Sequence, residues 1–244
     1  MILNIMNELG EKKVGGIVAE NFRTAKVFTD YGIDFCCKGG VKLRDACEKK
    51  GVNLDKITAE LAQVVKQQDE THYQDFGMTD LVDHIVNVHH KYVETTIPSL
   101  KFYVEKIAKV HGENHPELLE IRDEFFNTAD ALTTHMKKEE FILFPYIKAM
   151  EAARKNHFPL SPAHFGSIEN PISMMEEEHD AEGERFRKIS ALSNTYTPPS
   201  DACQTYKVAF AMLQEFENDL HTHIHLENNI LFPKAKEVFN SLNA

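Results

Sequence analysis

Histidine and glutamate recur at one fixed spacing in two separate parts of this chain. His135 precedes Glu139 by four residues, and His223 precedes Glu227 by the same interval. Residues four apart lie on one face of a helix, so each segment presents an imidazole beside a carboxylate. Four residues after each glutamate begins a Leu-Phe-Pro tripeptide whose apolar side chains are expected to be buried. The repeat predicts two halves of one metal centre, built between helices.

Each of these residues alone has a more ordinary interpretation. A single histidine is usually a core or surface side chain, and a single glutamate is usually solvated. Two inward carboxylates are costly to bury, and the chain offers no lysine or arginine at matching positions on the opposing face. A dication would satisfy both, and the two oxygens of each glutamate would also allow Glu139 and Glu227 to bridge two ions.

Two more imidazoles are expected from other segments. His179 lies on the apolar stripe of its segment, either as a ligand or as a core histidine hydrogen-bonded to a neighbour. Near residue 90 the sequence offers His84, His89 and His90, and helical periodicity places His89 nearest the centre of the stripe, with His90 at its edge.

The expected donor set is therefore four imidazoles and two carboxylates. Without thiolates, such a set favours iron or manganese over a closed structural zinc site. Two six-coordinate irons sharing these ligands would keep unfilled positions, where a small molecule reacts or from which an iron leaves. The second nitrogen of a ligating histidine needs an acceptor, and Asp180, Asp219 and Glu94 are near enough in sequence, although each is also an ordinary surface charge.

The segments that position these residues are expected to be helical, because strand-like alternation is absent. Four long periodic segments are predicted at 78–111, 115–152, 170–193 and 200–240. Helix-start signals are Pro116, Asn170 followed by Pro171, and Ser200. The predicted fold is all-α, an antiparallel four-helix bundle in which two helical hairpins face each other across the core.

A small helical domain is expected before the bundle, at residues 1–68, with the bundle itself at residues 78–240. Its predicted helices are Gly16–Tyr31, Lys42–Lys50 and Asp55–Lys66, the last capped by Asn53, and a linker is expected at Lys66–Gln74. A domain of this size is too small for a deep hydrophobic core of its own, so it is expected to pack against the rest of the chain or against a second copy of itself. A homodimer is expected.

The cysteines form no disulfide framework. Cys36 and Cys37 are adjacent, and neighbours close a disulfide only through a strained ring, so a free pair that is redox-active or binds metal transiently is predicted. The alternative is a small buried turn. Cys47 and Cys203 carry no pattern and are expected to be core residues.

Composition limits the classes of partner. The 244 residues carry a net charge of -11, which argues against nucleic acid and anionic membranes. No apolar run approaches the roughly 20 residues of a membrane span. The first residues lack a secretory signal, so a reducing, cytoplasmic setting is expected.

Several blocks resemble one known family. Residues 31–40 resemble the N-terminal domain of the iron–sulfur cluster repair di-iron proteins, also called RIC or ScdA/YtfE-type. Residues 135–145, 175–180 and 223–233 resemble that family's hemerythrin-like domain. The resemblance covers nearly the whole chain.

Carried over by position, the resemblance implies six metal ligands, which are His90, His135, Glu139, His179, His223 and Glu227. The segment around these histidines matches the family without a gap, and this match selects His90 and not His89 as the ligand. Gly183 stands where ordinary hemerythrins carry a further histidine after His179, which implies an exposed, reactive iron.

The resemblance also implies a function. Two non-haem iron ions, bridged by oxygen and carboxylates, would be donated to iron–sulfur clusters damaged by oxidative or nitrosative stress. The implied partners are damaged iron–sulfur proteins and an electron donor, with Cys36 and Cys37 serving electron entry, dimerisation or docking. Two alternatives stay open: an enzyme that reduces nitric oxide at the di-iron site, or a module that senses oxygen or nitric oxide.

Overall fold

The computed structural model describes residues 8–65 and 72–243, which form helices joined by turns. Within these residues the β pairing is one isolated bridge between Lys13 and Lys42. The predicted all-α class is therefore confirmed. None of the described helices is both long and apolar enough to span a bilayer. Contacts divide the chain into two units, residues 82–223 and residues 1–81 with 224–244.

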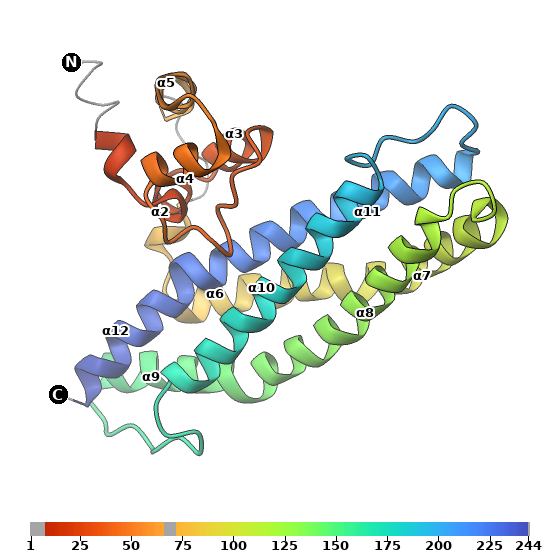
Figure 1. The fold of residues 1–244 in the computed structure, drawn as a ribbon. Coiled ribbons are helices and arrows are strands. Elements are labelled where there is room, and N and C mark those ends of the chain that lie inside the picture. The colour runs from red at the N-terminus through yellow and green to blue at the C-terminus, as the bar shows by residue number, and fades with distance from the viewer. Residues whose placement is uncertain (1–7, 66–71, 244) are drawn as a thin grey trace. The chain divides into compact units, whose positions relative to one another are not determined.

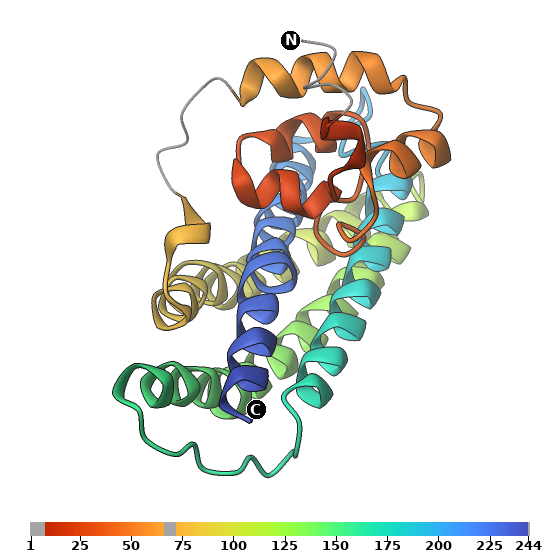
Figure 2. The same ribbon diagram turned by 90° about the vertical axis from the view of Figure 1, so that its left-hand side faces the viewer.

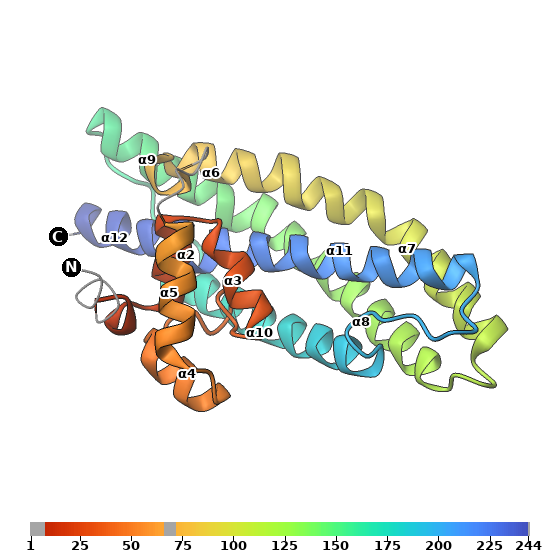
Figure 3. The same ribbon diagram turned by 90° about the horizontal axis from the view of Figure 1, so that it is seen from above.

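Four long helices run side by side in the larger unit (Figure 1), and the view from above follows them along their length (Figure 3). They are α7 (Lys91–His111), α8 (Glu117–Lys138), α10 (Glu169–Leu192) and α11 (Gln204–Leu226). Helix α6 (Met78–His84) leads into α7 through the π-helical segment η2 (Ile85–His90). Helix α8 continues into α9 (Phe144–Asn156) through a second π-helical segment, η3 (Glu139–Leu143).

The four helices meet around Phe216 of α11, whose side chain is fully buried. Its ring lies 5.4 Å from that of Phe125 on α8 and 5.7 Å from that of Phe186 on α10, measured between centroids. Tyr92 of α7 approaches the same ring at 6.1 Å. Aromatic side chains bury large apolar areas, so this cluster fixes the lateral spacing of the helices that carry the predicted ligands.

The N-terminal part of the smaller unit is built of short helices, which Figure 2 shows. They are α2 (Val14–Glu20), α3 (Thr24–Asp30), α4 (Leu43–Lys50) and α5 (Leu54–Val64). The 3-10 turn η1 (Tyr73–Asp75), the π-helical segment η4 (Glu227–Leu231) and α12 (Phe232–Leu242) complete the unit.

One predicted helix of this unit is wrong in its extent. The segment Gly16–Tyr31 breaks between α2 and α3, because Asn21 adopts an extended conformation and its side-chain oxygen accepts a hydrogen bond from the Arg23 amide at 3.0 Å. Asparagine favours such local turns over a continuous helix. The predicted cap at Asn53 is confirmed, since its side chain accepts from the Lys56 amide at 2.9 Å.

The predicted long helices are confirmed with small shifts at their starts. Helix α11 begins at Gln204, so Ser200 lies in the preceding turn and does not cap it. Helix α10 begins at Glu169, which places Asn170 inside its first turn. Residues 66–71 of the expected linker lie outside the described residues. The domain limits expected at residues 68 and 78 stay a prediction.

Candidate metal centre

The predicted ligands come from four different helices. His90 ends η2, His135 lies in the last turn of α8, and His179 lies in the middle of α10. His223 belongs to α11, and Glu227 follows it by one turn, at the first residue of η4. Helix α11 continues into η4 without a break, so His223 and Glu227 lie one helical turn apart on the same face. His135 and Glu139 are related in the same way.

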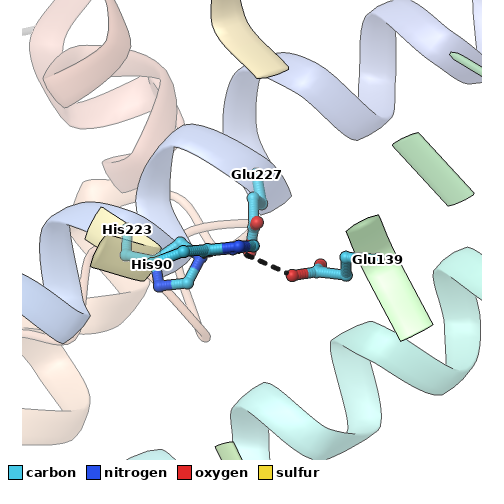
Figure 4. Close-up of side chains that lie close together, drawn as sticks. All are labelled: His90, Glu139, His223 and Glu227. Atoms are coloured by element: carbon cyan, nitrogen blue, oxygen red, sulfur yellow. Dashed lines mark hydrogen bonds and ion pairs between the residues drawn. The ribbon is translucent and has the colours of Figure 1, made fainter. Parts of the chain in front are cut away.

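All six side chains are buried. The two glutamates are 0% exposed, and the histidines are at most 3% exposed. One group combines His90, Glu139, His223 and Glu227, and a second combines His135, Glu139, His179 and Glu227, each with its donor atoms within 4.8 Å of one another. Figure 4 shows the imidazoles and carboxylates of the first group pointing toward a common centre. Glu139 and Glu227 belong to both groups.

Distances within the groups fit metal coordination. The Nε2 atoms of His90 and His223 are 3.2 Å apart, and those of His135 and His179 are 3.0 Å apart. Two nitrogens bound at about 2.1 Å to one ion at a right angle would be about 3.0 Å apart. Oε2 of Glu139 lies 3.3 Å from Nε2 of His90 and 3.4 Å from Nε2 of His135. The donor set and its spacing therefore suit a cation bound by each histidine pair.

The choice between His89 and His90 depends on a local change of helix type. Segment η2 is π-helical, with a wider turn than an α-helix, and it ends at His90. One extra residue in a turn rotates the following positions by about 100°, the angle per residue of an α-helix. His90 accordingly lies beside Glu139, His223 and Glu227, whereas Nδ1 of His89 lies 2.9 Å from a carboxylate oxygen of Asp219. Periodicity favours His89 only if the whole segment is a regular α-helix.

Carboxylates orient two of the histidines through their second nitrogen. Nδ1 of His90 lies 2.7 Å from Glu140, and Nδ1 of His135 lies 2.8 Å from Glu178. A proton on Nδ1 leaves the lone pair on Nε2, the atom that faces the cluster. Lys138 also pairs with Glu178. The hydrogen bond from His135, with help from Lys138, lowers the pKa of Glu178 to about 2.

Sequence patterns alone do not assign this role to Glu140 and Glu178. The candidates from sequence, Asp180 and Glu94, are exposed, and Asp219 faces His89. Glu140 and Glu178 are each adjacent in sequence to a predicted ligand, which was the available signal. Their partners lie 50 and 43 residues away along the chain, so only the packed bundle brings the pairs together.

A surface pocket reaches one of the two histidine pairs. Its volume is about 330 Å³, and His135 and His179 are part of its wall. Glu178, Lys138 and Arg185 line the same pocket, so charged side chains surround the approach to these imidazoles. The buried carboxyl of Glu182 also lines it and pairs with Arg185. His135 and His179 therefore border a pocket that is lined by charged side chains.

The cysteines lie elsewhere. Cys36 is buried, Cys37 is half-buried, and neither forms a disulfide. Cys47 is buried in α4, as predicted. The expectation of a core position for Cys203 is wrong, because this residue is exposed in the turn before α11, with its sulfur 3.2 Å from Nε2 of His111.

Comparison with known proteins assigns the chain to a family. Residues 81–235 match the family model of the hemerythrin HHE cation-binding domain, which defines the helical bundle as a cation-binding domain. Residues 10–65 match the model ScdA_N, described as a domain of unknown function, DUF542.

Full-length relatives narrow the family further. A probable iron–sulfur cluster repair protein of Haemophilus influenzae is 34% identical over 213 residues, covering 86% of this chain and 90% of the relative. The iron–sulfur cluster repair proteins YtfE of Dickeya chrysanthemi and Escherichia coli O81 are each 32% identical, covering 92% of this chain and 96% of the relative. The chain belongs to the family of iron–sulfur cluster repair proteins with a hemerythrin-like domain, as the resemblance predicted.

Proposed function

We propose that this protein repairs iron–sulfur clusters damaged by oxidative or nitrosative stress, by donating iron from a di-iron centre. The observation that carries the proposal is the membership of Glu139 and Glu227 in both ligand groups. Two carboxylates common to two histidine pairs suit two ions held side by side. The relatives bear the name of this repair activity.

The residues that would hold two irons are His90 and His223 for one ion and His135 and His179 for the other, with Glu139 and Glu227 available to both. Each iron would then receive two imidazoles and two carboxylates from the protein. Iron commonly has about six coordination positions, so each iron would keep positions for ligands that the protein does not supply. When bound, the pair of irons would supply redox and Lewis-acid chemistry.

We infer that iron would leave the centre through the pocket beside His135 and His179. His135 and His179 contribute to the pocket wall, so a competing ligand from the client can reach the iron of this pair. Gly183, one turn after His179 on α10, contributes no side chain that could fill a vacant position. Glu178 keeps the lone pair of His135 Nε2 directed at the cluster, and the same carboxylate lies in the pocket wall. We therefore assign the labile iron to His135 and His179.

A repair assay tests the donor role. An enzyme whose iron–sulfur cluster has been damaged by nitric oxide is incubated with the iron-loaded protein, and its recovered activity is measured. The wild type should restore activity, whereas a Glu139→Leu variant should not, because both ligand groups lose a carboxylate. Glu177→Leu, an exposed position on α10, is the matched control and should repair as well as the wild type. Equal repair by Glu139→Leu would overturn the proposal.

The client in this proposal is a damaged iron–sulfur protein. A homodimer, an external electron donor, a cytoplasmic location and a redox or docking role for Cys36 and Cys37 stay predictions from sequence. No specific observation favours nitric oxide reduction or gas sensing over repair as the main activity.

A further inference from the structure

The loop after α3 carries a second group of side chains of the types that bind metals, and this group contains none of the histidines of the candidate metal centre. Asp34, Cys36 and Cys37 each offer a donor atom, and these three atoms lie within 4.8 Å of one another. The two sulfurs are 3.7 Å apart, which is a hydrogen-bonding separation between two reduced thiols. A carboxylate oxygen of Asp34 lies 3.3 Å from the sulfur of Cys36.

These separations are those of ligands around one ion. Sulfurs bound tetrahedrally at about 2.3 Å to a common metal would be about 3.8 Å apart. A carboxylate oxygen bound at about 2.1 Å to the same metal would lie about 3.6 Å from each sulfur. The observed distances are 3.7 Å between the sulfurs and 3.3 Å from the Asp34 oxygen to the Cys36 sulfur, close to these values. The two adjacent cysteines and Asp34 are therefore spaced as ligands of one ion.

Backbone contacts hold the loop in this conformation. Oδ1 of Asp34 accepts hydrogen bonds from the amides of Cys36 at 3.1 Å, Cys37 at 2.9 Å and Lys38 at 3.3 Å. The side-chain amide of Asn229 donates to the Cys36 carbonyl at 3.1 Å. The donors are thus positioned before a ligand binds, which lowers the entropy that binding must remove.

The carboxylate of Asp34 and the thiol of Cys37 both lie beside the sulfur of Cys36, at 3.3 Å and 3.7 Å, so an isolated thiolate is disfavoured there. A reactive thiolate requires the opposite surroundings, with positive charge nearby. The carboxylate and second thiol that disfavour an isolated anion become ligands when a dication lies between them.

We propose that Asp34, Cys36 and Cys37 form a second metal site, which binds a transition-metal dication through two thiolates and one carboxylate oxygen. Binding breaks two S–H bonds, forms two metal–sulfur bonds and releases two protons to solvent. The loop supplies three donors, so a fourth position stays open for exchange. This inference does not rest on the proposed repair function.

Cobalt(II) is the probe for this site in the full-length protein. Bound thiolates give cobalt(II) an intense near-ultraviolet charge-transfer absorption that histidine and carboxylate ligands do not give. Anaerobic titration with cobalt(II), with a phosphine reductant, should produce this absorption in the wild type. It should disappear in the double variant Cys36→Ser/Cys37→Ser and persist in the control Cys203→Ser, whose thiol lies beside His111. An absorption missing from the wild type, retained by the double variant or removed by Cys203→Ser would overturn the proposal.

A second measurement needs no variant, so it decides the question even where the double variant fails to fold. Cobalt(II) should slow alkylation of the half-buried Cys37 by iodoacetamide at least about tenfold, because a metal-bound sulfur is a poor nucleophile. The exposed Cys203 is the internal control and should react at an unchanged rate. Equal alkylation of Cys37 with and without cobalt(II), measured by peptide mass spectrometry, would contradict the site.

Discussion

Nδ1 of His89 lies 2.9 Å from a carboxylate oxygen of Asp219, while the neighbouring His90 lies in one group with Glu139, His223 and Glu227. Two consecutive residues therefore have different surroundings. His89 also stacks on His223, with 5.7 Å between the ring centroids. This contact helps to hold the His223 imidazole in place, although His89 is not itself one of the proposed ligands.

This difference gives the first prediction. His90→Ala should lower iron affinity by more than the roughly 10–100-fold typical of losing an outer hydrogen-bond partner, because a direct donor is removed. His89→Ala should keep near-normal iron content. Iron bound per chain, measured after dialysis against a chelator, distinguishes the two variants. The reverse order would mean that His89 is the ligand.

The second prediction concerns the carboxylates behind the histidines. Glu140→Gln and Glu178→Gln should each weaken metal binding about 10–100-fold, because an amide fixes the imidazole less firmly and lowers its basicity. Glu178→Gln should also speed iron release to a competing chelator, since Glu178 lines the pocket beside His135. Glu177→Gln, the exposed neighbour, is the control. Identical chelator kinetics in the Glu177 and Glu178 variants would contradict the assigned role.

The third prediction separates two adjacent glycines of α2. A Cβ atom on Gly15 would lie 2.1 Å from Oδ1 of Asn229, whereas one on Gly16 would meet only the Lys13 side chain at 3.8 Å. Gly15→Ala should therefore lower the free energy of unfolding by about 1–3 kcal/mol, the usual range for overpacking. Gly16→Ala should be neutral or stabilising by up to about 1 kcal/mol, because alanine favours a helix. Denaturant unfolding of both variants tests the contact, and equal effects would contradict it.

The fourth prediction concerns Glu217, a half-buried residue of α11. Burial raises its pKa to about 7, against the opposing effects of Tyr196 and Arg187. The folded state thus binds this proton more tightly than the unfolded state, and the contribution of Glu217 to stability falls as pH rises from about 4.5 to 7.

Glu217→Gln removes the titrating group. At pH 8 the variant should be more stable than the wild type by about 1–2 kcal/mol, after allowance for partial solvent screening, and at pH 4 the two should be nearly equal. Glu215→Gln, at an exposed position of the same helix, should show no such pH dependence. A constant difference between wild type and Glu217→Gln across this range would exclude a raised pKa.

Sequence patterns predicted the long helices because their apolar stripes repeat over many turns. The pairing of His135 with Glu139 could also be predicted from sequence. These residues are four apart at the end of the regular helix α8, so they lie one helical turn from each other. His90 could not be predicted in this way, because η2 interrupts the period that the pattern assumes. The break at Asn21 depends on a local side-chain hydrogen bond that periodicity does not reveal.

The contacts that orient the site required the folded chain. Glu140 and Glu178 acquire their roles from histidines on other helices, at 2.7 Å and 2.8 Å. The spacing of the sulfurs of Cys36 and Cys37 likewise depends on loop conformation, which the adjacent pair of residues in the sequence leaves open.

Glu139 and Glu227 are proposed to bind both irons of one centre. Mössbauer spectroscopy of the iron-57-loaded protein, combined with iron and protein quantification, tests this most directly. Two irons per chain are expected in the wild type, present as a magnetically coupled pair, and that pair should be lost in Glu139→Leu. A single uncoupled iron per chain, or a coupled pair that survives in Glu139→Leu, would contradict this proposal.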